Sequence, residues 1–425
     1  MKKLLYISFL VLLFAACKGD PIFYALENEE KIEDSNNFKK TTPVGSIILF
    51  NDAGQDYYVT HGKQLWYSIA GSVQSPWNIV PKPEGYGSTS VVSSIAVYNS
   101  KVYVSLIDED NNSKTGLYYI TEVDGTLIKV LEYERRTDVD NNNDYYFYTI
   151  KLLPIEGGLY IVRTNRKWNT LTSDSSTVVD TEIFYFDTVL EEGVTLESGT
   201  AVSLPGLSGS PYIVRNMTST GTDTNEIYMT VNEVGKGVDY YASGKLFVAG
   251  SSTPESFTEE NPGESSSYNS VFYSDIHDIL LLSTRETGRN HSILYKLNNG
   301  GSWGAWQTGL EGDDDVQFSS FADISEMSGV GDIILVGTRG DVIDNSQTYY
   351  NGKGYYELNL SDRSNPLLQS NTFALDTNYN STDLKKATIM NFLYDSDRDK
   401  VYTSTSSYGL WLNQMNDGDR KWYQE

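Results

Sequence analysis

Short apolar segments separated by turn residues recur along most of the chain. The segment 101–105, for example, is nearly continuous in apolar residues and follows the turn Asn99-Ser100. Runs of this length that are rich in Val, Ile and Tyr and bounded by turn residues are typical of strands buried on both faces. The pattern recurs at intervals of about 57 residues, and its seven copies are 56–60, 101–105, 158–162, 226–230, 278–282, 332–336 and 400–404.

Two further apolar segments accompany each copy. In the first copy, 47–50 precedes the core across a tight turn and 65–67 follows it. Three short strands and a weaker outer one make a four-stranded antiparallel sheet of about 50 residues, and radial repetition of such sheets forms a β-propeller. A β-solenoid has shorter coils, and a sandwich would not repeat sevenfold. We therefore expect an all-β fold, a seven-bladed β-propeller over residues 46–425.

The middle residue of each core is expected to be buried at an equivalent position on the second strand of its own blade. These residues are Tyr58, Tyr103, Tyr160, Tyr228, Leu280, Ile334 and Tyr402. The first blade begins with its inner strand, and the last ends with an outer strand near 421–423. Closure of the ring therefore requires no strand exchanged between the first and last blades.

The amino-terminal residues have a different pattern. Lys2 and Lys3 precede an apolar run that extends from Leu4 to Ala16. As a helix this run would be about 20 Å long, which is too short for a hydrocarbon core of roughly 30 Å. A basic start, a short apolar run and small residues before a cleavage point are typical of a signal peptide, here residues 1–16.

Cys17 is the single cysteine of the chain and directly follows Phe14-Ala15-Ala16. This arrangement resembles the lipobox of bacterial lipoproteins, although Phe14 stands where Leu is usual. The resemblance implies that Cys17 is lipidated and anchors the protein to a membrane, extracytoplasmically, at the outer membrane or cell surface. Residues 17–45 would then comprise the lipidated Cys and an acidic flexible tether. The opening is similar to that of spirochaete surface lipoproteins and, less closely, to those of Bacteroidetes.

Composition narrows the classes of partner. The chain has 32 Lys and Arg against 57 Asp and Glu, for a formal charge of −25. Binding to nucleic acid needs clustered cations at phosphates, so we do not expect a nucleic-acid partner. One Cys excludes a disulfide scaffold and a Cys-rich zinc site. An envelope protein or a glycan remains as the expected partner.

Acidic and amide residues alternate in one predicted loop. Asp138, Asp140, Asn142 and Asp144 offer oxygen atoms in the alternation typical of calcium loops. The loop lacks the glycine at position six and the glutamate at position twelve of an EF-hand. Asp and Asn are also ordinary turn residues, so the alternative is a solvated turn. Calcium at these four residues is the one cofactor that the sequence suggests.

Catalytic motifs are scarce. The sequence contains no nucleophile elbow, phosphate-binding glycine loop or HExxH. The segment 298–303 resembles a degenerate Asp-box of sialidase-like propellers, but a sialidase also needs an arginine cluster and a Tyr–Glu pair. His277 and His291 lie in predicted turns and are interpreted as turn residues. The tripeptide Arg339-Gly340-Asp341 matches an integrin-binding motif and is interpreted as an incidental loop.

The leading hypothesis is a lipid-anchored, non-enzymatic binding or scaffold module whose loops and channel mouth recognise a protein or a glycan. One alternative is an extracellular glycan-active enzyme (a glycosidase, a sialidase-like enzyme or a lyase) with carboxylates and aromatic residues at the propeller funnel. Another is an outer-membrane assembly scaffold. The propeller lipoproteins of that machinery carry a Trp-based blade motif followed by Thr-Gly, which is not found here.

Overall fold

The computed structural model describes residues 43–425 except for 72–75, 109–113, 138–143, 170–176, 208–209, 221–225, 235–243, 263–266, 286–291, 298–300, 308–315, 341, 344–347, 350–351, 364–365, 370–372, 380–381 and 417. The chain divides into two units, Met1–Asn37 and Phe38–Glu425, and the first lies entirely outside the described residues. The expected signal peptide and Cys17 are in that first unit. In the described part of the chain, no helix has the length and apolar character needed to cross a bilayer.

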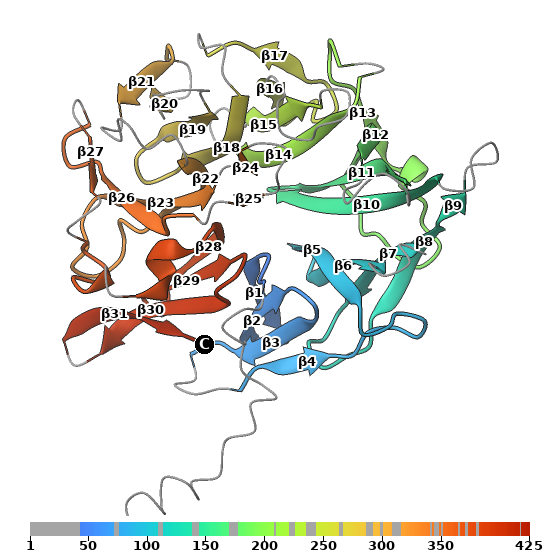
Figure 1. Cartoon of the computed structure of the whole chain (residues 1–425), viewed down its shortest axis with the longest axis horizontal. Coiled ribbons are helices and arrows are strands. Elements are labelled where there is room, and N and C mark those ends of the chain that lie inside the picture. The colour runs from blue at the N-terminus through green and yellow to red at the C-terminus, as the bar shows by residue number, and fades with distance from the viewer. Residues whose placement is uncertain are drawn as a thin grey trace, which may run out of the picture. The chain divides into compact units, whose positions relative to one another are not determined.

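The second unit is a ring of seven antiparallel sheets, which we call blades 1 to 7 (Figure 1). Blade 1 contains β1 (Ile47–Asp52), β2 (Gln55–His61), β3 (Leu65–Ile69) and β4 (Asn78–Val80). Blade 2 contains β5 (Ser90–Tyr98), β6 (Lys101–Asp108), β7 (Lys114–Ile120) and β8 (Ile128–Glu134). Blade 3 contains β9 (Arg136–Thr137), β10 (Asp144–Ile155), β11 (Gly158–Asn169), β12 (Thr177–Phe186) and β13 (Thr200–Val202).

The remaining blades follow the same order of strands from the ring axis outward. Blade 4 contains β14 (Tyr212–Ser219), β15 (Glu226–Glu233), β16 (Gly244–Gly250) and β17 (Thr258–Glu260). Blade 5 contains β18 (Ser267–Ser274), β19 (Ile279–Arg285), β20 (Ser292–Leu297) and β21 (Gly304–Gln307). Blade 6 contains β22 (Val316–Asp323), β23 (Ile333–Gly340), β26 (Tyr355–Asn359) and β27 (Leu367–Gln369), with the separate hairpin β24 (Val342–Ile343) and β25 (Thr348–Tyr349). Blade 7 contains β28 (Ile389–Asp395), β29 (Lys400–Thr405), β30 (Leu410–Asn416) and β31 (Asp419–Gln424).

The seven residues expected on second strands are all buried, each in a different blade. They lie on β2, β6, β11, β15, β19, β23 and β29. Side chains of successive residues on a strand point to opposite faces, so a second strand contacts both neighbouring blades. Leu280 of β19 packs in a cluster with Tyr228 of blade 4, whereas Leu281 packs in another with Ile334 of blade 6. The sevenfold repeat and the burial of its cores are therefore confirmed. The prediction that the seven positions are equivalent was wrong, because Tyr103 packs toward the following blade whereas Leu280 and Ile334 pack toward the preceding one.

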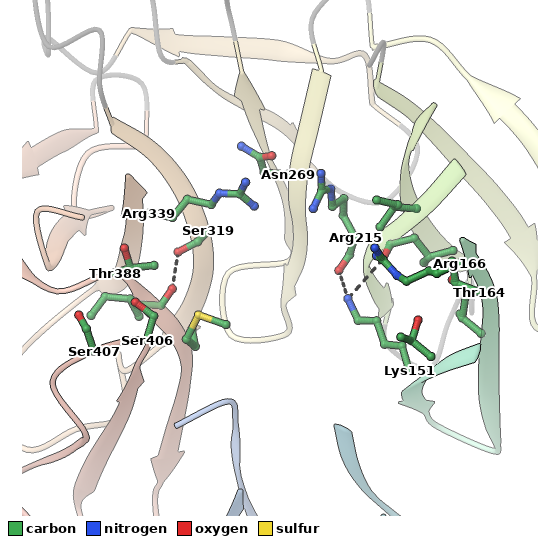
Figure 2. A pocket seen from close by; sticks show the side chains of 16 residues that line it. Lys151, Thr164, Arg166, Arg215, Asn269, Ser319, Arg339, Thr388, Ser406 and Ser407 are labelled. Carbon is green, nitrogen blue, oxygen red and sulfur yellow. Dashed lines mark hydrogen bonds between the residues drawn. The ribbon is translucent and has the colours of Figure 1, made fainter. Parts of the chain in front are cut away.

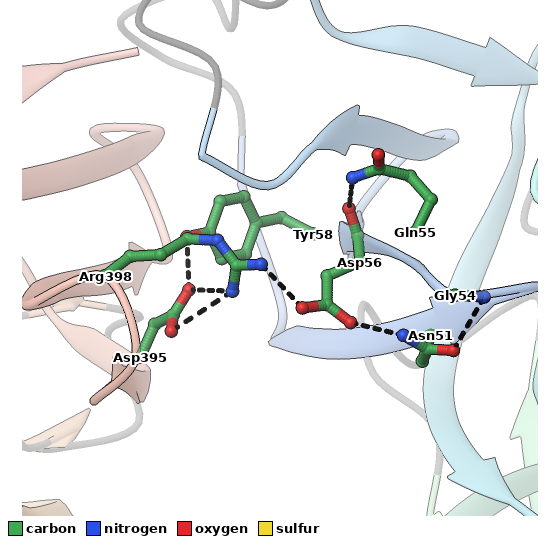
Figure 3. A network of polar contacts seen from close by, with 7 residues as sticks. All are labelled: Asn51, Gly54, Gln55, Asp56, Tyr58, Asp395 and Arg398. Atoms are coloured by element: carbon green, nitrogen blue, oxygen red, sulfur yellow. Dashed lines mark hydrogen bonds and ion pairs between the residues drawn. The ribbon is translucent and has the colours of Figure 1, made fainter.

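Blade 7 meets blade 1 mainly through side chains (Figure 3). Arg398, in the turn before β29, contacts Asp56 of β2 at 2.5 Å and Asp395 at 3.1 Å. The buried Asp395 carboxylate also accepts a hydrogen bond of 2.5 Å from Tyr58. Val44 N donates to Thr405 O at 2.9 Å. Each of the two blades consists of consecutive strands, so the prediction of closure without an exchanged strand is confirmed.

Blade 3 departs from the regular repeat. Its first two strands, β10 and β11, are 12 residues long each and pair continuously from Asp144↔Asn169 to Ile155↔Gly158. The short β9 covers the free edge of β10 at its amino-terminal end, opposite Tyr145 and Tyr146. Blade 3 therefore carries a two-stranded extension beyond the length of its neighbours' inner strands.

Candidate binding site in the central channel

A cavity of about 690 Å³ lies on the ring axis (Figure 2). Its walls come from blades 3 to 7. The lining residues belong to β10, β14, β18, β22 and β28, to the second strands of blades 3 and 6, and to the residues just before β28 and just after β29 in blade 7. In an antiparallel hairpin the start of the inner strand lies beside the end of the second strand. The pairs Thr149↔Thr164 and Gln317↔Arg339 show this register. All the lining residues therefore lie at one end of the channel.

Four cationic residues line this cavity, although the protein as a whole is acidic. They are Lys151 of β10, Arg166 of β11, Arg215 of β14 and Arg339 of β23. Among the described lining residues there is no carboxylate and no aromatic side chain. Cations gathered in a concave, partly desolvated space focus a positive potential there. The channel mouth is therefore suited to anionic groups.

The polar side chains divide between two sides of the cavity. Figure 2 shows Lys151, Arg166 and Arg215 on one side. On the opposite side lie hydroxyl residues of blades 6 and 7, which are Ser319, Thr388, Ser406 and Ser407. Arg339 projects from that side toward Asn269. An anion in the cavity would thus meet charged donors on one wall and mainly neutral donors on the other.

Lys151 is held in place by the backbone of the next blade. Its Nζ donates to the carbonyl oxygen of Val214 at 3.4 Å and to that of Arg215. Burial, together with the smaller effect of the neighbouring Arg215 guanidinium, lowers the pKa of this ammonium to about 8. A lysine at that pKa is mostly charged at neutral pH, and a bound anion would favour the charged form.

Backbone and amide contacts also fix other parts of the wall. Ser319 Oγ donates to the carbonyl oxygen of Ile389 at 2.8 Å, linking blade 6 to blade 7. With the Asn232 amide turned so that its oxygen faces Arg215, that oxygen accepts from Nε at 2.9 Å. Such contacts limit the rotamers of the lining side chains, which reduces the entropy lost when a ligand binds.

The predicted calcium loop lies mostly outside the described residues. Asp138, Asp140 and Asn142 are in the gap 138–143, and only Asp144, the first residue of β10, is described. Its buried carboxylate forms an ion pair of 2.7 Å with Lys167. Within the described ranges no group of three or more His, Cys, Asp or Glu side chains could hold a metal ion. Calcium at this loop stays a prediction.

Arg339 and His277, which were interpreted from the sequence as a loop residue and a turn residue, are both less exposed to solvent than such positions usually are. Arg339 is on β23 and lines the cavity, so the interpretation of its tripeptide as an incidental loop was wrong for this residue; Asp341 is outside the described residues. His277 does lie in the β18–β19 turn, but it is buried. Its Nε2 lies 2.8 Å from Ser325 Oγ, away from the cavity lining.

The cationic cluster itself was not anticipated. Its members lie in blades 3, 4 and 6, more than 40 residues apart in several cases, so only the ring brings them together. One signal was present in the sequence. Thr164 and Arg166 follow the apolar core 158–162 at every second position and so share a face with Val162, which predicts a polar end to that face of the strand.

Comparisons with known proteins give the fold and little more. No family model and no curated protein matches the chain. A structure from an analysis of two prolyl endopeptidases is similar, with a TM-score of 0.52 and 15% identity over 90% of this chain and 50% of that chain. A GH74 enzyme of Niastella koreensis gives a TM-score of 0.46 at 13% identity, over 91% of this chain and 54% of that one. A chain of the mitotic checkpoint complex gives 0.44 at 12% identity, over 89% and 96%.

This chain therefore spans about half the length of the first two of these proteins. At such identities the likeness concerns the fold alone. The conclusion from sequence, structure and comparison together is that the described chain is a seven-bladed β-propeller.

Proposed function

We propose that this protein is a non-enzymatic binding module of the cell envelope, anchored through lipid on Cys17, that binds anionic groups of a protein or glycan partner at the mouth of its channel. The observation that carries the proposal is the set of four cationic residues in one cavity of an acidic protein. Cations in a restricted space favour anions by direct charge-assisted hydrogen bonds, and arginine does so in a bidentate geometry.

The composition of the described lining supports binding over glycan hydrolysis. Hydrolysis of glycosides by most known enzymes uses two carboxyl groups about 5 to 10 Å apart. The described part of the lining offers cations, hydroxyls and an amide instead. This set can hold and orient an anion, but its described members include no carboxyl group to act as the general acid or the nucleophile of such a pair.

The distribution of charge adds specificity. The rest of the protein carries the acidic excess, which repels polyanions from its outer surface within a Debye length of about 8 Å at physiological salt. An anionic partner is therefore directed to the channel mouth, where the local charge is reversed. For a module tethered at a membrane, restriction of anion binding to the channel mouth reduces unspecific binding of the other envelope polymers around it.

Calorimetric titration with citrate tests the proposal. We expect the full-length protein to bind citrate, and Arg215→Leu or Lys151→Met to weaken binding by about tenfold or more, since a charge-assisted hydrogen bond contributes about 1.5 to 3 kcal/mol. Lys129→Met serves as the control, because Lys129 is exposed and pairs with Glu132 on blade 2. Citrate recovered after long incubation should be chemically unchanged. Equal affinity in Arg215→Leu and Lys129→Met would refute binding at the channel mouth.

A further inference from the structure

The extension of blade 3 continues one wall of the cavity beyond its end. Side chains on paired strands share a face at every second residue, so 145, 147, 149 and 151 of β10 share a face with their partners on β11. Those partners are 168, 166, 164 and 162. Thr149, Lys151, Val162, Thr164 and Arg166 line the cavity. Phe147, Tyr145 and Trp168 therefore continue the lined face outward.

Contacts on the opposite face of the hairpin support this assignment of faces. Lys167 pairs with Asp144 at 2.7 Å and lies over the ring of Tyr146 at 5.7 Å. Arg163 lies 5.3 Å from the ring of Tyr148. These residues alternate with those of the lined face, so charged side chains cover one face of the hairpin. The aromatic residues of the other face continue the cavity wall.

The aromatic part of the lined face has an apolar base and accessible rings. Phe147 is buried, whereas Tyr145 and Trp168 are half-buried and directly opposite each other on the two strands. The Tyr145 and Phe147 ring centroids are 6.2 Å apart, and Arg135 lies 4.7 Å from the Tyr145 ring. We call Tyr145, Phe147 and Trp168 the aromatic wall. Tyr and Trp offer a flat apolar surface with a polar edge, which suits the face of a sugar ring.

We propose that the ligand is an acidic polysaccharide whose sugar rings stack on the aromatic wall while its carboxylates enter the cationic cavity. This inference rests on the proposed function, since it specifies the class of anion that the same site binds. Trp168 is two residues beyond Arg166, about 7 Å along the strand, and Tyr145 is six residues from Lys151, about 20 Å. Contact with both Lys151 and the outer end of the aromatic wall therefore requires a chain, because a monosaccharide does not span about 20 Å.

The covered edge of β10 favours a glycan over an acidic peptide. Extended peptides commonly bind by adding a strand to an open sheet edge, where backbone hydrogen bonds provide the affinity. At the outer end of the aromatic wall that edge is occupied, because β9 pairs with Tyr145 and Tyr146. The remaining interactions are ring stacking and ion pairing, and an acidic polysaccharide offers partners for both. The cavity volume of about 690 Å³ lies within the usual range for ligand sites.

Titration of the full-length protein with tetragalacturonate tests this inference. We expect binding to weaken by roughly five- to tenfold in Trp168→Leu, consistent with the energy of an aromatic contact, and by tenfold or more in Arg215→Leu. Trp168→Phe should retain most of the affinity because a ring remains. Tyr146→Leu is the matched control, since Tyr146 is an aromatic residue on the opposite face of the same hairpin. The fully methyl-esterified oligomer should not bind.

A tetraglutamate peptide distinguishes an acidic glycan from an acidic peptide as the ligand. We expect it to bind more weakly than tetragalacturonate and to be insensitive to Trp168→Leu. Equal affinity for the two probes, or equal effects of Trp168→Leu and Tyr146→Leu, would overturn the glycan inference. The proposed function would then still stand if Arg215→Leu weakened citrate binding. If Arg215→Leu weakened the binding of none of these anions, the proposed function would instead be overturned. Circular dichroism of each variant verifies that the ring is folded.

Discussion

Replacement of Arg398 by Met should destabilise the ring at the seam between blades 7 and 1. Methionine keeps most of the apolar stem but removes the guanidinium, which lies 2.5 Å from Asp56 and 3.1 Å from Asp395. The Asp395 side chain is 1% exposed, and after the substitution Tyr58 OH would be its remaining side-chain donor among the described residues. Asp56 would retain the hydrogen bond of 2.6 Å from Asn51. The main cost therefore comes from Asp395.

The size of the effect follows from burial. Loss of one partner from a fully buried ion pair costs about 3 to 5 kcal/mol, because the other charge is left uncompensated. The Arg398 side chain is 22% exposed, so water can replace part of the lost interaction with Asp395. We therefore expect the free energy of unfolding to fall by about 2 to 3 kcal/mol. Asp395→Asn combined with Arg398→Met should recover part of this loss, since a neutral amide needs no counter-charge.

Urea unfolding followed by tryptophan fluorescence and by circular dichroism measures this change. Coincident transitions from the two probes justify extraction of a free energy by linear extrapolation. Lys129→Met is the control, because Lys129 is 52% exposed and its ion pair with Glu132 is 3.4 Å long. That substitution should cost less than about 0.5 kcal/mol. If Arg398→Met cost no more than Lys129→Met, the reasoning on the seam would be refuted.

Three further predictions address the anchor, the metal and the pH dependence of stability. Cys17→Ser should move the protein from the membrane fraction to the soluble fraction with its circular dichroism unchanged, and unchanged membrane retention would contradict lipidation. Calorimetry should show calcium binding to the wild type and less heat with Asp140→Ala; equal heats would leave a solvated turn. Burial lowers the pKa of His61 to about 4. Unfolded histidine has a pKa near 6.5, so the unfolded state binds the proton first as the pH falls. Stability should therefore drop by about 3 kcal/mol between pH 6.5 and 4, and His61→Gln should flatten this profile, which urea unfolding at several pH values would reveal.

The sequence predicted the repeat because each blade is locally encoded. Tyr103, for example, lies between two apolar residues and follows a tight turn, a pattern that predicts its strand and its burial without reference to the other blades. The seam was also predictable in outline, since the strands of the first and last blades are consecutive. These features depend on short-range patterns, which a repeat presents several times over.

The binding site depended instead on long-range geometry. Net charge averages over the whole chain and so concealed the gathering of Lys151, Arg215 and Arg339 in one cavity. The β10–β11 extension was not expected, because its first residue, Asp144, belongs to the run of acidic and amide residues that was interpreted as a loop. Tyr145 and Trp168 are nevertheless strong strand formers, and their cross-strand pairing extends the hairpin in the structure.

The closing seam also has a consequence for the order of folding. Trp77 of blade 1 donates to the Glu425 carboxylate at 3.1 Å, and Arg398 meets Asp56 across 342 residues of chain. Contacts of such sequence separation form late, because loop closure over a long chain must precede them. The ring therefore cannot close until the polypeptide through Glu425 has emerged. Until that moment blades 1 and 7 both expose an apolar face, so the nascent open ring is the species most in need of protection from aggregation.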